Sequence, residues 1–289
     1  MKKYLIFAVA IVLFFAGLSL YQVIIFNDGR LHVTICDVGQ GDAVVIRTPA
    51  GQVIIFDGGS DREVLGCLSR SLPFWQRRID LMLLSHPHAD HLNGLVDVLK
   101  SYSVRQFATE DLANSSDGFK ALQASVKKEG IIWQTLLRGD SIKMSGGLNL
   151  IVVGPTKEYL DKTSINGQIS SNEFASLEML LKYGEFKMLL TGDSQYQQLT
   201  EAISLHRELL SDITVLQQPH HGSRTGITPE IISILSPDLA AISVGVKNSY
   251  GHPAPNILSM LQNAGVRISR TDKEGDLRLV TDGKSYNLQ

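Results

Sequence analysis

Apolar residues follow two different patterns along this chain. Tyr4–Phe26 form one run of 23 residues without a charged side chain, preceded by Lys2 and Lys3. From about Leu31 onward the apolar residues come in short runs separated by glycine- and proline-containing turns. The first pattern predicts one long apolar helix. The second predicts a folded region of alternating strands and helices.

The short runs predict a meander of three strands followed by strands and helices in alternation. A later pair of strands, joined at Gly184 and Glu185, resembles a hairpin. By pattern alone, the fold class is α/β or α+β in one domain over residues 31–289. Short strands are also predicted after the last helix, toward the end of the chain. The other predicted strands are Leu31–Cys36, Ala43–Thr48, Gln52–Phe56, Ile79–Leu84, Val104–Ala108, Leu148–Val153, Leu177–Tyr183, Phe186–Leu190, Ile213–Leu216 and Leu239–Ser243. The predicted helices are Asp61–Leu72, His91–Lys100, Asp117–Glu129, Ser194–Leu205, Pro229–Leu235 and Pro255–Ala264.

Composition narrows the possible function classes. A length of 289 residues with 44% hydrophobic content allows one large buried core. The chain has 27 basic and 29 acidic residues, a net charge of −2. Such a balance creates no basic field, which argues against tight, sequence-independent nucleic-acid binding by the free domain. This charge balance is still compatible with a nuclease that other proteins hold near its substrate.

The N-terminal apolar run predicts export of the folded domain. As a helix, residues 4–26 can span a hydrocarbon core of roughly 30 Å. A signal peptide has a shorter apolar region, and although Gly17 and Ser19 offer a cleavage site, the run stays apolar through Phe26. We therefore favour a single-pass membrane anchor. The positive-inside rule makes residues 1–3 a cytoplasmic segment and places the domain outside the cytoplasm; if the segment is cleaved, the domain is secreted.

Two cysteines, Cys36 and Cys67, are too few for a disulfide framework. Cys36 belongs to a strand-like run, where we expect it to pack as a small hydrophobe.

A cluster of metal-ligand types follows the predicted strand Ile79–Leu84. His86, His88, Asp90 and His91 lie within six residues. Imidazole and carboxylate are ligands that suit zinc and similar divalent ions. Two ligand pairs so close together suit a two-metal site. The alternative is a polar turn whose histidines cap the following helix.

Further candidate ligands follow two other apolar runs. Asp193 comes after Leu190-Thr191-Gly192, and His220 and His221 come after Ile213–Leu216. Chemistry in α/β proteins gathers where strands end. Asp193 is thus a candidate bridging carboxylate, although alone it would fit a turn or a helix N-cap. Either histidine of the adjacent pair is a candidate ligand, and their adjacency leaves the choice open.

These motifs together resemble the metallo-β-lactamase fold hydrolases, and more narrowly the hydrolase domain of the ComEC competence proteins and its free-standing relatives. The resemblance runs from about Leu31 to Val280 and includes Asp37–Ala43, Asp57–Gly59, Ser85–His91, Leu190–Asp193, His220–Ser223, Ser243–Gly245, Asn248–Pro253 and Thr271-Asp272. It implies a four-layer αββα sandwich with a site for two divalent ions, zinc or manganese, at one edge. The activity it implies is hydrolysis of phosphodiesters, possibly DNA, by a metal-bound hydroxide.

Each candidate residue then receives an expected role. Asp90 would also orient the nucleophile, His220 would face the substrate, and His252 would assist the leaving oxygen unless it is a structural loop histidine. Ser223 and Asn248 are expected to bind substrate, with a turn cap as the alternative for Ser223. The expected metal ligands are His86, His88, Asp90, His91, Asp193 and His221; the expected supporting residues are Asp57, Asp37 and Asp42, the last two with an alternative as turn residues.

One departure from the family pattern affects the first metal position. Two-zinc members typically supply another histidine between the cluster and the bridging aspartate, but the chain has none between His91 and Asp193. Three protein ligands with an open position still suit a catalytic zinc. Asn172 lies near the expected place, where a loop role is as plausible. Alternative functions are hydrolysis of another exported ester, such as a phosphocholine ester, or a non-catalytic metal-binding scaffold; protein partners are not predicted.

Overall fold

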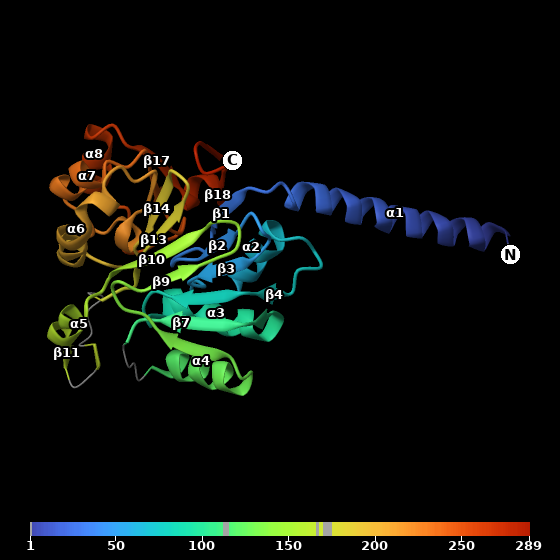
Figure 1. Cartoon of the computed structure of the whole chain (residues 1–289), viewed down its shortest axis with the longest axis horizontal. Coiled ribbons are helices and arrows are strands. Elements are labelled where there is room, and N and C mark those ends of the chain that lie inside the picture. Colours follow the sequence, from blue (N-terminus) through green and yellow to red (C-terminus); the bar gives the residue numbers. More distant parts are fainter. Residues whose placement is uncertain (1, 112–115, 166–167, 170–174) are drawn as a thin grey trace.

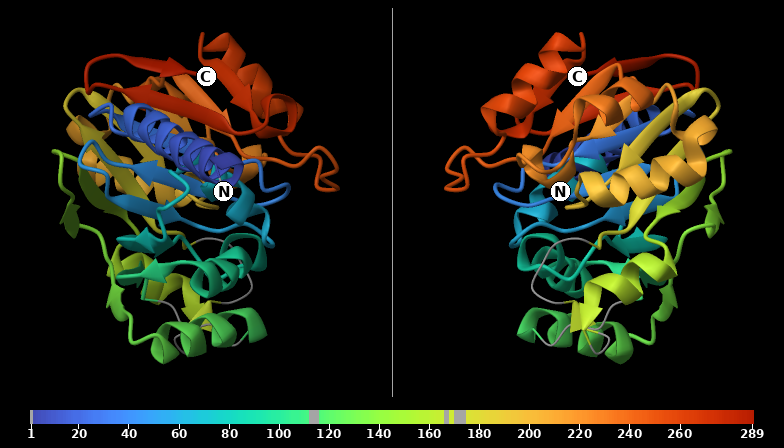
Figure 2. Two further views of the ribbon diagram at one scale, coloured as in Figure 1. Left: turned by 90° about the vertical axis from the view of Figure 1, so that its right-hand side faces the viewer. Right: turned by 90° about the vertical axis from the view of Figure 1, so that its left-hand side faces the viewer.

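The computed structural model describes residues 2–111, 116–165, 168–169 and 175–289. Two β-sheets pack face to face between two layers of helices (Figures 1 and 2). One sheet has the order β19-β18-β1-β2-β3-β5-β7-β8 and the other has β17-β16-β15-β14-β13-β10-β9. Helices α2, α3 and α4 cover the outer face of the first sheet, and α6, α7 and α8 cover that of the second. The predicted αββα architecture is confirmed.

The elements have the following bounds. The first sheet contains β1 Leu31–Ile35, β2 Val44–Arg47, β3 Val53–Phe56, β5 Leu81–Leu84, β7 Gln106–Thr109, β8 Ile132–Thr135, β18 Leu277–Thr281 and β19 Tyr286–Leu288. The second contains β9 Ser141–Lys143, β10 Asn149–Gly154, β13 Glu178–Tyr183, β14 Phe186–Leu190, β15 Val215–Gln217, β16 Leu239–Ile242 and β17 Arg267–Arg270. Two small pairs are β4 Arg78–Ile79 with β6 Ser103–Val104, and β11 Ser164–Ile165 with β12 Gln168–Ile169. The helices are α1 Lys2–Phe26, α2 Glu63–Ser71, α3 Ala89–Ser101, α4 Asp117–Lys128, α5 Lys157–Thr163, α6 Tyr196–Leu210, α7 Pro229–Leu235, α8 Pro255–Asn263, α9 Thr271–Glu274 and the 3₁₀ turn η1 Pro219–Gly222.

Central strands are apolar throughout because each sheet is covered on both faces. In β3, Ile54 and Phe56 face the core between the sheets. Their neighbours Val53 and Ile55 face the core beneath α2 and α3. Successive side chains of a strand point to opposite faces, so one continuous apolar run serves two cores.

Helix α1 extends away from the sandwich (Figure 1). Among the described residues it is the one helix long and apolar enough to cross a membrane, by length and composition. Its last residue, Phe26, contacts the domain through Arg47. The Arg47 guanidinium donates to the Phe26 carbonyl and lies 5.4 Å from the centre of its ring.

Several strand predictions differ from the structure. The run Ile79–Leu84 is divided into β4 and β5 at Asp80, whose N–H donates to the Val53 carbonyl and whose carboxylate accepts from the Val53 N–H. The elements β8, β9, α5, β11 and β12 were not predicted. Strand β8 lies at the sheet edge with most side chains partly or fully exposed, so it has no alternating pattern.

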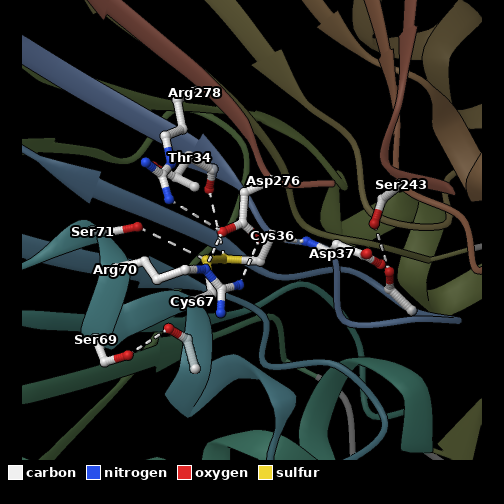
Figure 3. Close-up of a disulfide and its surroundings, with 12 residues drawn as sticks. Thr34, Cys36, Asp37, Cys67, Ser69, Arg70, Ser71, Ser243, Asp276 and Arg278 are labelled. Carbon is white, nitrogen blue, oxygen red and sulfur yellow. Dashed lines mark hydrogen bonds and ion pairs between the residues drawn. A yellow bond between two sulfur atoms is a disulfide. The ribbon is translucent and has the colours of Figure 1, made fainter. Parts of the chain in front are cut away.

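The prediction that Cys36 packs simply as a small hydrophobe is wrong. Cys36 and Cys67 form a disulfide with a Cα–Cα distance of 5.8 Å (Figure 3). The bond joins the end of β1 to α2, and both side chains are fully buried. The two residues are separated by 31 positions, so only the packing of α2 against the sheet brings them together.

Candidate metal centre

The predicted ligands lie in loops at one edge of the sandwich. His86 and His88 follow β5, Asp90 and His91 begin α3, and Asp193 follows β14. His221 lies in η1, which follows β15. Strands β14, β15 and β16 are parallel, as are β3, β5 and β7. Within each sheet, parallel strands end at the same edge. The two sheets pack with these edges together, so residues more than 100 positions apart in the sequence meet here.

Asp193 lies between two groups of potential ligand atoms. Within each group, the atoms lie within 4.8 Å of one another. Its Oδ1 is 3.2 Å from His91 Nε2 and 3.5 Å from His221 Nε2. Its Oδ2 is 3.7 Å from His86 Nε2. One group contains Asp90, His91, Asp193 and His221; the other contains His86, His88 and Asp193.

The chemistry of these residues fits divalent metal ions. His86 Nε2, His91 Nε2, His221 Nε2 and Asp193 Oδ1 are buried, and none has a hydrogen-bond partner among the described residues. Buried polar atoms are rarely left unpaired in a native protein. Imidazole and carboxylate are also the donors that zinc and manganese accept. An ion at each group would be coordinated by these converging atoms.

Hydrogen bonds on the far side of the imidazoles orient them toward the centre. His91 Nδ1 lies 2.8 Å from Asp57 Oδ2, and Asp57 Oδ1 accepts from the Ser85 N–H at 2.7 Å. His221 Nδ1 donates to the Ser243 carbonyl at 3.0 Å. These contacts leave each Nε2 directed at Asp193. Such bonds fix the tautomer and ring orientation of a metal ligand.

The charges of the cluster are strongly coupled. Burial and the nearby His91 hold the pKa of His86 well below its ordinary value. Burial opposes protonation of His91, but Asp193 and Asp57 raise its pKa well above the ordinary value. Asp193 is also buried, yet His91 and His221 hold its pKa well below the usual range. A bound cation would replace these protons, so metal binding should be coupled to proton release.

His220 and His221 face different oxygens of Asp193, and both adopt left-handed backbone conformations, with φ of 50° and 55°. This conformation is uncommon for residues with a side chain and often marks functional sites. His221 Nε2 lies 3.6 Å from Asp90 Oδ2, within one ligand group. His220 Nε2 lies 3.6 Å from Asp193 Oδ2, and its ring also borders the adjoining pocket.

A pocket of about 180 Å³ opens beside the ligand groups. The His252 ring lies 5.5 Å from that of His220 and is stacked with Tyr250, which is 70% exposed. Burial and the neighbouring His220 lower the pKa of His252 to about 4, so its imidazole is neutral at pH 7. The pocket is lined by Gln40, His88, Asp90, Asp193, His220, His221, Tyr250 and His252.

The two aspartates of the β1–β2 loop occupy different environments. Asp42 is buried, and its Oδ1 lies 3.5 Å from His221 Nδ1. Asp37 instead accepts from the Gly39 N–H within its own turn, and its backbone N–H donates to Asp276. Asp42 therefore belongs to the surroundings of the metal centre, whereas Asp37 lies on the disulfide side (Figure 3).

Two expected substrate-binding residues are directed at the protein itself. The Ser223 hydroxyl lies 3.3 Å from that of Thr225. The Asn248 amide donates to the His252 carbonyl at 2.9 Å and accepts from the His252 N–H at 3.0 Å. In the structure, Asn248 thus positions His252 instead of lining the pocket, and Ser223 does not line it either. Asn172 lies outside the described residues.

Sequence reasoning missed several residues of the site. Gln40 and Tyr250 line the pocket, but neither residue type by itself suggests a metal or phosphate site. The Ser85 hydroxyl lies 3.0 Å from His86 Nδ1, and its position directly before the histidine cluster was the only available signal. The Ser243 carbonyl is a backbone group, for which a sequence carries no signal.

Comparisons with known proteins agree with this geometry. The family model described as the metallo-beta-lactamase superfamily matches residues 36–246. The chain is 28% identical over 265 residues to ComE operon protein 3 of Bacillus subtilis, covering 86% of this chain and 32% of that protein. It is 26% identical over 270 residues to competence protein ComA of Neisseria gonorrhoeae, covering 92% and 35% respectively. The chain thus spans about a third of the length of these curated relatives.

Solved structures agree at the level of fold. The metallo-beta-lactamase fold protein YhfI of Bacillus subtilis superposes with a TM-score of 0.53 at 14% identity, covering 83% of this chain and 96% of that one. Zinc-bound PqqB of Methylobacterium extorquens superposes with a TM-score of 0.53 at 12% identity, covering 83% of this chain and 97% of that one. The family match covers most of the folded region and every predicted ligand. The chain belongs to the metallo-β-lactamase superfamily.

Proposed function

We propose that this protein is a metal-dependent phosphodiesterase that cleaves nucleic-acid strands outside the cytoplasm. The observation that carries the proposal is the pair of ligand groups that share Asp193 and border a pocket lined by His220 and His252. Paired metal positions suit phosphodiester cleavage, since two cations can balance charge on both the attacking and the leaving oxygen. Competence protein ComA of Neisseria gonorrhoeae and Recombination protein 2 of Haemophilus influenzae, to which the chain is 26% identical in each case, support DNA as the substrate.

In this proposal, different residues of the protein act on the nucleophile, the leaving oxygen and the bases of the substrate. Ions in the two positions would lower the pKa of a water molecule and supply the nucleophile. Asp90 is partly buried, which opposes its ionisation, but His221 and His91 keep its pKa below the usual range, so its carboxylate can accept a hydrogen bond from that water. The neutral imidazole of His252 can donate a hydrogen bond to the leaving oxygen. Tyr250, exposed at the rim, can stack on a base.

Export is proposed from two independent features. Disulfides persist in oxidising compartments and are rare in the cytoplasm, so the Cys36–Cys67 bond supports an extracytoplasmic domain. Lys2 and Lys3 before the apolar segment favour a cytoplasmic N-terminus. We infer that α1 is retained as an anchor that holds the domain near the membrane.

The test is hydrolysis by the full chain in detergent, stripped with chelator and reloaded with zinc or manganese. Bis-p-nitrophenyl phosphate, single-stranded DNA and double-stranded DNA are the substrates. We expect metal-dependent cleavage that Asp193→Ala abolishes and Asp37→Asn, a matched acidic control outside the pocket, leaves intact. Cleavage of choline phosphoesters but not DNA would favour the alternative ester substrate. Metal binding without hydrolysis of any phosphoester would favour a scaffold and overturn the proposal.

A further inference from the structure

The loop between α2 and β4 exposes two adjacent aromatic side chains. Phe74 is 49% exposed and Trp75 is 43% exposed, with their rings 4.9 Å apart in an edge-to-face arrangement. Arg77 and Arg78, which follow in the chain, are exposed as well. Tryptophan beside cationic residues is the composition found at membrane–water interfaces, where an amphipathic ring lies at the level of the lipid headgroups.

This loop lies beside the last turns of α1. The Phe74 N–H donates to Gln22 Oε1 at 3.3 Å, and the loop and α1 extend from the same side of the domain (Figure 1). Gln22 precedes the end of α1 by four residues, or about 6 Å along the helix. The aromatic pair is therefore level with the end of the apolar segment, where a spanning helix meets the interface.

A cavity of about 270 Å³ separates the loop from the helix. Val23 and Phe26 of α1 and Trp75 of the loop contribute apolar walls, and Arg47 also lines it. Arg47 is 5% exposed: its Nη1 donates to the Phe26 carbonyl and its Nη2 lies 3.7 Å from Asp28 Oδ1, while its Nε has no hydrogen-bond partner in the part of the chain that the structure describes. An apolar space beside a guanidinium whose Nε is left without a partner suits the upper acyl chain of a phospholipid, with its phosphate accepting from that Nε–H.

We propose that Phe74 and Trp75 insert into the interfacial region of the bilayer that α1 crosses, with lipid filling the cavity beside them. The domain is then held against the membrane at two points and has a defined orientation. This inference rests on α1 being a retained anchor, as in the proposed function, but not on the reaction catalysed.

The chain contains two tryptophans, which allows one to serve as the control for the other. Trp133 lies on β8, where its ring packs against Phe107 at 4.5 Å, and four strands separate β8 from β1, the strand that follows α1. The full chain would be reconstituted in phosphatidylcholine and phosphatidylglycerol vesicles, with or without lipids brominated on the acyl chains. Trp133→Phe leaves Trp75 as the reporter, and Trp75→Phe leaves Trp133.

We expect brominated lipid to quench Trp75 emission, more strongly when the bromines lie near the glycerol end of the chain than near its methyl end. Trp133 emission should be unchanged. Equal emission of Trp75 in both kinds of vesicle, with the chain still resistant to carbonate extraction, would overturn membrane docking while leaving the anchor intact. A chain extracted by carbonate would overturn both. Hydrolytic activity in detergent is measured separately, so its loss bears only on the proposed reaction.

Discussion

Asp193 is the residue that couples the two halves of the candidate centre. Its oxygens face His91 and His221 on one side and His86 on the other, so its removal leaves both ligand groups incomplete. His252 lies across the pocket and belongs to neither ligand group. Single substitutions should therefore separate metal binding from catalysis.

We expect Asp193→Ala to lose most of its bound metal, because two cations would then face each other without the carboxylate between them. His252→Ala should retain its metal and lower kcat by roughly 10²- to 10³-fold, the usual range for loss of one hydrogen-bond donor to an oxygen that gains negative charge. Elemental analysis and steady-state kinetics of both variants test this. Equal loss of metal in the two variants would show that the roles are misassigned.

Asp57 acts through His91 by holding its Nδ1. Asp57→Asn should weaken metal binding by roughly 10- to 100-fold, as for other partners of metal-bound histidines. Asp37→Asn is the matched control, since Asp37 turns away from the centre. Competition with a chromogenic chelator measures both affinities. Similar affinities for the two variants would contradict the assignment.

Individual elements carry ionisable groups whose burial affects stability. Glu178 begins β13 and is fully buried. Burial raises its pKa to about 8, although Ser194 and Gln198 act in the opposite direction. Glu110, which follows β7, is also buried, and burial raises its pKa well above the ordinary value. Neither carboxyl belongs to the ligand groups.

The contribution of Glu178 to the free energy of unfolding should fall as pH rises from the ordinary glutamate pKa of 4.5 to about 8. In this window the folded state keeps the Glu178 proton that the unfolded state has released, so folding becomes less favourable as pH increases. Above about 8 the contribution is lost and the curve levels. Glu178→Gln should make the free energy of unfolding fall less with pH than in the wild type, leaving the parts due to Glu110 and the buried histidines. Urea unfolding of both proteins between pH 4.5 and about 8 measures this dependence. The same pH dependence in Glu178→Gln as in the wild type would refute the prediction.

The disulfide between β1 and α2 is an element-level constraint. Because 31 positions separate the cysteines, replacing both by alanine should lower the free energy of unfolding by about 3–4 kcal/mol. Reductant should destabilise the wild type comparably and leave the double variant unaffected. Denaturant unfolding with and without reductant tests this. A wild type insensitive to reductant, with two thiols that react with maleimide before reduction, would contradict the bond itself.

At the scale of the whole molecule, α1 and the sandwich are nearly independent. None of the described residues of α1 is buried. The contacts between α1 and the sandwich involve Arg47 and the loop at Phe74. Each ligand and each core cluster lies after Phe26. The core therefore does not require the apolar segment.

A fragment of residues 27–289 should fold, bind as much metal as the full chain and hydrolyse a small phosphodiester at a comparable rate. Circular dichroism, metal analysis and kinetics compare the two proteins in the same detergent. A fragment that stays unfolded after refolding with metal would show that the contacts of Phe26 and Gln22 are needed for folding.

Local sequence determined the chemistry of this protein and most of its elements. Ligand types cluster in His86–His91, and apolar runs reveal buried strands because burial on both faces leaves no alternation. The same reasoning missed β8, since an exposed edge strand carries no such pattern. The four-layer arrangement was predictable only through the family resemblance, because helices and strands in this order fit more than one fold.

Tertiary structure alone decided which side chains meet. The orientation of His221 depends on a left-handed backbone and on the Ser243 carbonyl, and that of His91 on Asp57, 34 positions away. The disulfide and the position of Phe74 beside Gln22 likewise depend on how distant segments pack. Residue types along a chain specify possible interactions, whereas distances between remote residues arise only from the packing of complete layers. The pairings in this site are therefore properties of the fold.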